Sequence, residues 1–434
     1  MVRITYEEIA SVMGAEAAER VHLLAQQAEQ VGVRFALVGG VVRDVLLRMP
    51  TTDYDFVVDG GPLGLAAAGE LAGAVKEKYG GVVKGHAVFG TATWLPPSSF
   101  TDGDALAPDH YDFASARSET YERPGALPVP APTTLEDDLR RRDFTSNAMA
   151  LMLAPQSEYG RVIDRHGGLD DIDSGELRVI HPQSFVDDPT RIFRGARLAA
   201  RLGFAFADDT EGLIPRALSA IDHVSGERIR TELRLILVES SASDALMALD
   251  DYGALAAIHP ALRVTDTLDS DLLAIHDEPP SDLETAAWCA WLCRLDPSEI
   301  RDISVRLAFS AALAGAVNAT AALVHNPADL ARKKPSAIYH RLHSLPEPAI
   351  IAAGRVLGGK YAKNVEKYLN TWRYYKTVTT GEALKQLGIP PGPRYKLILQ
   401  QLLDARLDAV INSDAEEIDF LRDLIDRLPA DDHA

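Results

Sequence analysis

The chain has 434 residues, 47% hydrophobic and 25% charged, an ordinary globular composition with room for about two to four domains. No stretch approaches the ~18 consecutive apolar residues of a membrane helix, so we expect no membrane partner. The net charge of −19 taken alone argues against a nucleic-acid partner, because phosphate binding relies on Lys and Arg.

The first part of the chain mixes strands and helices. Residues 3–31 predict a helical lead-in, because apolar residues recur there at helical spacing. Strands are predicted at residues 35–38, 53–58, 82–83, 91–94 and 110–114, and helices at 41–48 and 63–79. Strands separated by short loops, with helices to one side, predict a small mixed sheet. Residues 118–134 are rich in Pro and Gly and predict a surface loop that could be mobile and functional.

Beyond about residue 175 the pattern becomes helical. Helices are predicted at residues 190–202, 227–239, 242–250, 283–293, 300–323, 360–372 and 395–409. Cys289 and Cys293 lie four residues apart in a helical pattern, so we expect free thiols that face a core. Two unpaired cysteines fit a reducing cytoplasm. The predicted fold class is α+β, with a small mixed-sheet head and an all-helical remainder.

The most informative segment is a glycine turn followed by two aspartates. The apolar run 35–38 ends at Gly39 and Gly40, and Asp53 and Asp55 then fall on alternate positions before a second apolar run. Alternate residues of a strand point to one face, so the two carboxylates converge beside a loop whose backbone can approach a phosphate. Paired carboxylates facing a triphosphate are what Mg²⁺-dependent phosphoryl or nucleotidyl transfer requires.

Three neighbouring residues extend this candidate site. Asp112 lies on a neighbouring predicted strand and could supply a third carboxylate, or it could be an exposed edge residue. Arg43 lies near the helix start after the glycines and could reach a phosphate. Asp44 could instead pair with a neighbouring arginine as a structural brace.

Residues 136–150 form a dense run of charge that leads into an apolar segment. Arg142 could hold the triphosphate, and Asp143 could accept a hydrogen bond from a ribose hydroxyl. The alternative is a salt-bridged helix start with Asn147 as a local cap.

Residues 186–197 place an aspartate before a predicted helix that carries three arginines. Arg191, Arg194 and Arg197 are three apart and therefore line one helix face. Together with Asp188 they offer an acceptor and several donors on one side, the mixed set that a base edge needs. The alternative is that these arginines pair with acids elsewhere in the region.

The negative total conceals a basic, aromatic region between residues 332 and 376. This region contains ten Lys and Arg residues but only two glutamates, and six Tyr and Trp residues are interleaved with them. Cations mixed with aromatics suit a structured RNA, since they can meet phosphates and stack on bases. The alternative is a solvated helical face with buried rings.

Taken together, these segments resemble the class II tRNA nucleotidyltransferases, that is, the CCA-adding enzymes and bacterial poly(A) polymerases of the polymerase β superfamily. The resemblance spans essentially the whole chain, and the matching segments are residues 39–44, 53–55, 141–148, 187–194 and 388–393. The chain departs from the family at Asp187, where Glu is more common, and this change keeps the charge.

The resemblance implies a catalytic head at 1–155, a nucleotide-selecting neck at 156–265, a body at 266–345 and a tRNA-binding tail at 346–434. It implies Asp53 and Asp55 as ligands of Mg²⁺, and the set of catalytic carboxylates is Asp53, Asp55 and Asp112. Asp188 and Arg191 would read the base. The full predicted nucleotide-binding set is Gly39, Gly40, Arg43, Arg142, Asp143, Asn147, Asp188, Arg191, Arg194 and Arg197. The predicted RNA-binding residues are Lys333, Lys334, Lys360, Lys363 and Arg373.

The resulting hypothesis is an enzyme that adds CMP and AMP from CTP and ATP to the tRNA 3′ end without a template, releasing pyrophosphate. A CC-adding or A-adding enzyme of a split system has the same chemistry and stays an alternative. A poly(A) polymerase is a further alternative, although a strongly basic extension is expected there and this chain ends acidic. From a different class, the chain could be a catalytically idle RNA-binding relative.

Overall fold

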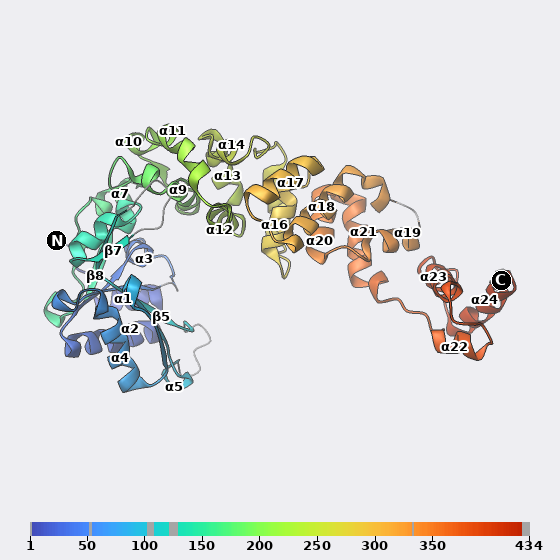
Figure 1. Ribbon diagram of the computed structural model, residues 1–434, viewed down its shortest axis with the longest axis horizontal. Helices are drawn as coiled ribbons and strands as arrows, with labels where there is room; N and C mark the ends of the chain where they lie inside the picture. The colour runs from blue at the N-terminus through green and yellow to red at the C-terminus, as the bar shows by residue number, and fades with distance from the viewer. Residues whose placement is uncertain (1, 52–53, 102–107, 121–128, 332–333, 428–434) are drawn as a thin grey trace. The chain divides into compact units, whose positions relative to one another are not determined.

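The structure is a computed structural model that describes residues 2–51, 54–101, 108–120, 129–331 and 334–427 (Figure 1). The chain forms two compact units. The first is Met1–Arg228 with Asp244–Ile258, and the second is Ile229–Ser243 with His259–Ala434. In the part of the chain that is described, no helix has both the length and the apolar character needed to cross a bilayer.

A seven-stranded mixed sheet forms the centre of the first unit. Its strand order is β3-β4-β5-β2-β1-β8-β9. The strands are β1 (Arg34–Val38), β2 (Asp55–Asp59), β3 (Val82–His86), β4 (Thr91–Leu95), β5 (Tyr111–Ser115), β8 (Met149–Ala154) and β9 (Val162–Asp164). β2 and β5 run parallel, and the other neighbours run antiparallel. The predicted mixed sheet is therefore confirmed.

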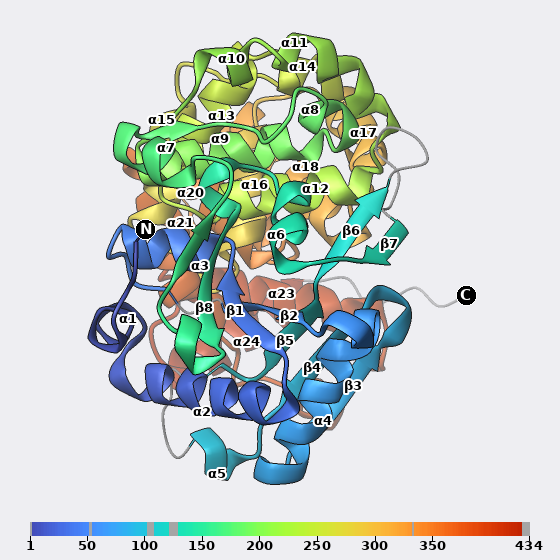
Figure 2. The same cartoon turned by 90° about the vertical axis from the view of Figure 1, so that its left-hand side faces the viewer.

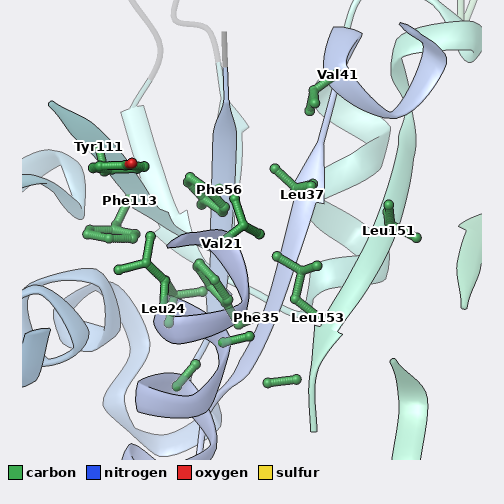
Figure 3. Packing of buried hydrophobic residues seen from close by; sticks show 14 of the residues in the cluster. Val21, Leu24, Phe35, Leu37, Val41, Phe56, Tyr111, Phe113, Leu151 and Leu153 are labelled. Atoms are coloured by element: carbon green, nitrogen blue, oxygen red, sulfur yellow. The ribbon is translucent and has the colours of Figure 1, made fainter. Parts of the chain in front are cut away.

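Helices α1 (Tyr6–Met13), α2 (Ala15–Val31) and α4 (Ala67–Tyr79) belong to the core on one face of this sheet (Figure 2). Phe35 of β1 and Phe56 of β2 project to this face, where their rings stack with centroids 4.9 Å apart (Figure 3). Burial of a side chain of this size contributes about 1.5–3 kcal/mol. This helix-covered face is therefore a principal stabilising core of the unit.

The opposite face of the sheet carries the candidate site. Val38 of β1 and Val57 of β2 pack there in a second buried cluster with α6 (Leu135–Asp138) and η3 (Leu139–Arg141). Successive strand residues alternate between faces. Asp55 stands two positions before Val57, so it begins β2 on this second face.

The rest of the described chain is mostly helical, which confirms the predicted α+β class with a helical remainder. In the first unit the further helices are α3 (Gly40–Leu46), α5 (Ser98–Thr101), α7 (Gly168–Ser174), α8 (Ser184–Asp187), α9 (Thr190–Leu202), α10 (Asp208–Glu211), α11 (Ile214–Ala217) and α14 (Ala254–Ile258). Helices α12 (Gly226–Leu237) and α13 (Ala242–Asp251) each have residues in both units. A short strand pair, β10 (Glu176–Leu177) with β11 (Ala205–Phe206), interrupts the predicted all-helical region.

Helices are the only regular secondary structure among the described residues of the second unit. Its helices are α15 (Leu268–His276), α16 (Leu283–Leu292), α17 (Pro297–Arg306), α18 (Ala311–His325), α19 (Pro335–Leu342), α20 (Glu347–Leu357), α21 (Gly359–Asn370), α22 (Gly381–Gln386), α23 (Pro393–Leu407) and α24 (Asp414–Arg427). Cys289 and Cys293 are buried free thiols, as predicted.

The prediction of a loop over residues 118–134 is wrong at both ends of the segment, where the structure has strands. β6 (Arg117–Thr120) and β7 (Val129–Pro132) form an antiparallel pair, and the residues between them lie outside the described chain. The prolines of β7, at 130 and 132, are two apart, so both missing N–H groups fall on the same edge of the strand. A two-stranded sheet has a free edge that needs no donors, and this is why prolines are tolerated there.

Two predicted helical stretches are interrupted. The lead-in divides at Gly14, whose φ is +88°. The predicted helix at 300–323 divides into α17 and α18, because the Ser310 side chain accepts a hydrogen bond from Leu313 N and caps a new helix. Apolar periodicity continues across both breaks and therefore does not reveal them.

β8 and β9 were not among the predicted strands. All six residues of β8 are buried, so this central strand lacks the polar–apolar alternation that marks a half-exposed strand. β9 has only three residues. A short apolar run of this kind does not distinguish a strand from a helix by pattern alone.

Candidate active site

The end of β1 and the start of β2 meet at the glycine turn. Gly39 has a φ of +82°, a conformation that favours glycine. A Cβ atom at this position would lie 2.9 Å from Arg142 Nη1 and 3.6 Å from Asp55 Oδ2. Gly39 therefore allows a guanidinium and a carboxylate to approach the backbone closely at the start of α3.

Asp55 and Asp112 stand opposite each other on the adjacent parallel strands β2 and β5. This confirms the predicted neighbouring strand for Asp112. The Thr93 hydroxyl of β4 donates a hydrogen bond of 2.5 Å to Asp112 Oδ1, and His110 Nε2 lies 3.4 Å from Asp112 Oδ2. A row of three strands thus places two carboxylates side by side and orients one of them.

A cavity of about 480 Å³ opens beside Asp55 and is lined mainly by charged side chains. The lining residues are Gly39, Gly40, Asp55, Glu119, Arg141, Arg142, Asp143, Asn147, Asp188, Arg191, Arg194, Arg197 and Arg228. Six arginines and four carboxylates give this lining a net positive charge in a strongly acidic chain. We call it the arginine cavity. Guanidinium groups are well suited to phosphate oxygens, so the lining fits a phosphorylated ligand.

A fully buried carboxylate, Asp138, organises one wall of this cavity. Its oxygens accept hydrogen bonds from Arg141 Nε at 3.0 Å, from Arg142 Nη2 at 3.4 Å and from the backbone N–H of Arg117 at 3.0 Å. Arg142 Nε is buried and has no hydrogen-bond partner among the described residues. The wall is therefore held in place, and the guanidinium of Arg142 has further N–H donors on its Nη atoms besides the one that Asp138 accepts from.

Phe144 joins this wall to α9. Its ring is fully buried and lies 6.1 Å from the ring of Phe206. A Cβ atom at Gly195 of α9 would lie 2.4 Å from Phe206 Cζ and 2.8 Å from Phe144 Cζ. The missing side chain at Gly195 thus lets α9 pack tightly on both rings, which sets the position of the α9 arginines.

Asp143 adds a polar contact at the same junction. Its Oδ2 accepts a hydrogen bond from Arg194 Nη1 at 3.1 Å, and its Oδ1 accepts from Asn147 Nδ2 at 3.0 Å and from Phe144 N at 2.8 Å. Burial raises the pKa of Asp143, but Arg194 and Asn147 outweigh this and hold the pKa below its ordinary value. Both carboxylate oxygens accept hydrogen bonds from the protein itself, so Asp143 acts as a structural brace between this wall and α9.

Asp188 is oriented by three donors as the chain enters α9. Its Oδ1 accepts from Thr190 Oγ1 at 2.7 Å, from Thr190 N at 3.2 Å and from Arg228 Nη2 at 2.8 Å. The bond from Thr190 N, two residues further on, closes an Asx turn that lies just before the N-cap of α9, Pro189. The carboxylate is therefore fixed at the edge of the arginine cavity.

The three predicted arginines of α9 line the same cavity, as their spacing requires. Arg191 is 5% exposed and donates to Ser184 Oγ at 2.6 Å and to the carbonyl oxygen of Arg141 at 2.8 Å. A guanidinium carries five N–H donors, so these two bonds orient Arg191 and leave further donors.

Known proteins match both the sheet region and the helical region that follows it. Residues 35–178 match the family described as the poly A polymerase head domain, and residues 203–265 match the probable RNA and SrmB-binding site of polymerase A. An A-adding tRNA nucleotidyltransferase of Halalkalibacterium halodurans is 29% identical over 413 residues, which cover 92% of this chain and 91% of the relative. The A-adding tRNA nucleotidyltransferase of Geobacter sulfurreducens is 35% identical over 398 residues. This match covers 86% of the present chain but less than half, 43%, of that relative.

A solved structure extends the agreement to nearly the whole chain. The complex of a CCA-adding enzyme with ATP superimposes with a TM-score of 0.78 at 25% identity, covering 98% of this chain and all of the other. The head region and the segment after it thus carry domains of the poly(A) polymerase family, and nearly the whole chain is similar to tRNA nucleotidyltransferases. It is therefore a nucleotidyltransferase, and enzymes of this family generally use a divalent metal.

The donor set of this nucleotidyltransferase suits a hard divalent cation in part. Asp55 and Asp112 provide carboxylate oxygens, the ligands that such cations prefer. Asp53, the other predicted metal ligand, lies outside the described residues. Among the residues that are described, no group of three or more His, Cys, Asp or Glu side chains is placed to hold a metal ion.

Arg43 of the nucleotidyltransferase does not line the arginine cavity. The side chain is 2% exposed and donates to Asp44 Oδ1 at 2.6 Å and to Asn147 Oδ1 at 2.6 Å. The predicted brace involving Asp44 is thus confirmed. Burial lowers the pKa of Arg43, and the carboxylate of Asp44 opposes this effect. The predicted phosphate contact of Arg43 stays a prediction.

Three lining residues were absent from the predicted site. Arg141 precedes the predicted Arg142, so the doubled arginine was a usable signal. Glu119 lies in the segment that was predicted to be a loop, and it pairs with Arg141 at 2.9 Å. Arg228 stands 40 positions after Asp188, and no local pattern connects the two.

The predicted RNA-binding cations lie on separate elements of the second unit. Lys334 precedes α19, Lys360 and Lys363 are on α21, and Arg373 is in η8 (Trp372–Tyr374). Lys333 lies outside the described residues. Arg373 forms an ion pair of 2.6 Å with a glutamate at the start of α20, and this contact partly neutralises its charge toward an RNA phosphate.

Proposed function

We propose that this nucleotidyltransferase adds CMP and AMP to the 3′ end of tRNA, using CTP and ATP without a template. The observation that carries the proposal is the arginine cavity, which joins Asp55 to an oriented aspartate and three arginines of α9. In the reaction, the terminal ribose 3′ oxygen bonds to the α-phosphorus of the nucleotide. The bond from that phosphorus to the bridging oxygen breaks, and pyrophosphate leaves.

The phosphate end of the nucleotide belongs at the glycine turn. Gly39 and Gly40 line the cavity and present backbone at a helix start, and Arg142 lies against Gly39. Backbone N–H groups and a guanidinium together neutralise phosphate oxygens effectively. Arg142 is the residue we assign to the triphosphate, because its guanidinium lines the cavity and its Nη1 lies against Gly39.

The base end belongs at Asp188 and Arg191. Cytosine and adenine each carry an exocyclic amino group that a carboxylate can accept from, whereas a thymine-like base presents a carbonyl at that position. Asp188 is oriented as an acceptor, and Arg191 offers donors beside it. The same pair can therefore bind both CTP and ATP and reject UTP. Selection by these two side chains needs no nucleic-acid template.

We assign Mg²⁺ to Asp53 and Asp55, with Asp112 adjacent. When bound, Mg²⁺ would polarise the phosphate and promote ionisation of the ribose hydroxyl. The protein's own part is to hold the carboxylates on neighbouring strands and to orient Asp112 through Thr93. In the proposed organisation, residues 1–155 catalyse, residues 156–265 select the nucleotide, and residues 266–345 and 346–434 hold the tRNA.

A second candidate is addition of AMP alone. The curated relatives from Halalkalibacterium halodurans and Geobacter sulfurreducens are both named A-adding enzymes. The arginine cavity suits either candidate, since both require recognition of an amino-bearing base.

Three tRNA transcripts distinguish the candidates: one without the CCA end, one ending in CC and one with the complete end. Each is incubated with labelled CTP or ATP. Complete CCA addition predicts CTP use on the first transcript and ATP use on the second. ATP use on the CC-ended transcript alone would establish the A-adding candidate, and CTP use alone a CC-adding enzyme. Long adenylate tails would indicate a poly(A) polymerase. Absence of incorporation on all three would refute the proposed activity and favour an RNA-binding relative.

A further inference from the structure

A second cavity of about 480 Å³ lies in the second unit, between α19, residues 375–380 and α23. We call it the aromatic cavity. It is lined by Tyr339, His340, His343, Tyr375, Lys376, Thr377, Thr379, Thr380, Lys396, Leu399, Gln400 and Leu403. None of the predicted RNA-binding residues is among them.

Two stacked rings line this cavity, and one of them is buried while the other is exposed. Tyr339 is 6% exposed, and its ring stacks on His343 with centroids 4.7 Å apart and planes 19° apart. His343 is exposed, and so is Tyr375 on another part of the lining. A flat ring at the open end of a stack offers a surface on which a further planar group can lie.

The charge of the aromatic cavity contrasts with that of the whole chain. Its lining includes Lys376 and Lys396 and no Asp or Glu, although the chain contains 63 acidic residues. Threonine hydroxyls and the Gln400 amide add groups that can both donate and accept hydrogen bonds. This combination suits a ligand that has a planar polar ring and a negative charge.

Hydrogen bonds connect α19 to α23 and the residue that follows it, so the two helical walls of the cavity are held together. Ser336 of α19 donates to Asp408 through its backbone N–H and its hydroxyl, each at 2.9 Å. His340 of α19 and Asp404 of α23 are in hydrogen-bond contact at 2.5 Å. Fastened walls make the cavity largely preformed, which lowers the ordering cost of binding.

We propose that the aromatic cavity binds one unstacked nucleotide of the RNA substrate. The base would extend the Tyr339–His343 stack, and its phosphate would meet Lys376 and Lys396. An unpaired nucleotide is required, because a base inside a duplex does not expose its faces. The proposal rests on the proposed function, in that the RNA is a tRNA, whose loops contain unpaired nucleotides.

The first test compares whole tRNA with a fully paired acceptor-stem duplex that has the same 3′ end. His343→Ala is expected to weaken tRNA binding about tenfold with an unchanged salt dependence, since stacking is lost. Lys396→Gln is expected to reduce the slope of log affinity against log salt by about one. Lys385→Gln on α22 is the matched control, because Lys385 is exposed and outside the cavity lining. An equal loss on the loop-free duplex would overturn the proposal.

The second test locates the contact directly. Cys289 and Cys293 are buried, and burial raises the pKa of each thiol to about 12, so a thiol-directed benzophenone should react with Tyr375→Cys alone. A photo-crosslink to an unpaired tRNA nucleotide is the expected result. A crosslink to a paired stem, or none while tRNA is bound, would refute the inference. The crosslink does not depend on incorporation, so failure of the proposed activity remains distinguishable.

Discussion

The arginine cavity and the aromatic cavity have the same volume, about 480 Å³, but opposite construction. The first holds six arginines among four carboxylates, and buried acids such as Asp138 and Asp143 fix several of the cations. The second has two lysines, an aromatic stack and no carboxylate in its lining. An acidic chain can therefore create a local cationic site either by holding arginines rigidly with acids or by keeping acids out of the cavity lining.

The difference matches two kinds of recognition. Paired, oriented guanidinium groups present donors in fixed directions, which suits selection of one small ligand. Rings and flexible lysines tolerate any base and any phosphate, which suits a large RNA gripped without reading its sequence. The two sites should therefore be separable by mutation, and pairing with acids should be what makes the first one rigid.

The largest effect is expected from Asp55→Asn. It removes a carboxylate at the start of β2, beside the arginine cavity, so incorporation should fall below detection. tRNA affinity, measured by filter binding, should remain unchanged because the aromatic cavity is untouched. Asp109→Asn, an exposed carboxylate near Asp112, is the matched control. Loss of tRNA binding together with activity would contradict the separation of the two sites.

Asp138→Asn should cost about 3 kcal/mol of unfolding free energy, because it removes the buried carboxylate that pairs with both Arg141 and Arg142 and, among the described residues, leaves only Glu119 beside Arg141. Urea unfolding followed by circular dichroism measures this loss. Asp137→Asn alters the adjacent exposed carboxylate and should change stability by less than about 0.5 kcal/mol. Similar values for the two variants would show that pairing does not make the arginine cavity rigid.

Gly195→Ala should destabilise the protein by about 2 kcal/mol, because the new methyl group would overlap the rings of Phe206 and Phe144. It should also raise the KM for the nucleotide, since the α9 arginines would shift. Gly73→Ala in α4 is the control, because a Cβ there meets no atom within 4 Å and alanine favours helix. Equal stability of the two variants would refute the close packing of α9.

The smallest effect is expected from the titration of Asp143. Arg194 and Asn147 hold the pKa of this carboxyl below its ordinary value despite burial. The resulting stability is present above the ordinary pKa and is lost as pH falls through the folded-state pKa. Wild-type unfolding free energy should therefore decline in this acidic range more steeply than that of Asp143→Asn. Parallel curves from pH 7 down to pH 3 would contradict the assignment.

Local features of the site followed from short-range patterns. The glycine turn after β1, the placement of Asp55 on one strand face and the common face of Arg191, Arg194 and Arg197 require only the periods of strand and helix. The adjacency of Asp112 followed from a neighbouring predicted strand. These properties depend on backbone geometry, which a few consecutive residues determine.

Other features depended on contacts between distant segments. Arg43 has the spacing of a phosphate ligand, yet the fold buries it against Asn147, 104 positions later. Glu119 lies on β6, which pairs with a proline-containing strand, and it contacts Arg141, 22 positions later. Arg228 reaches Asp188 from another helix.

The sequence by itself determined the resemblance to the nucleotidyltransferases, the class of chemistry and the residue types that carry it, because these reside in contiguous motifs. Only the tertiary structure decided which cations are committed to internal partners and which face a cavity. It also brought Tyr339, Tyr375 and Lys396 together around one cavity, although each comes from a different element. The physical reason is that pairing and burial depend on distances across the fold, which no local period encodes.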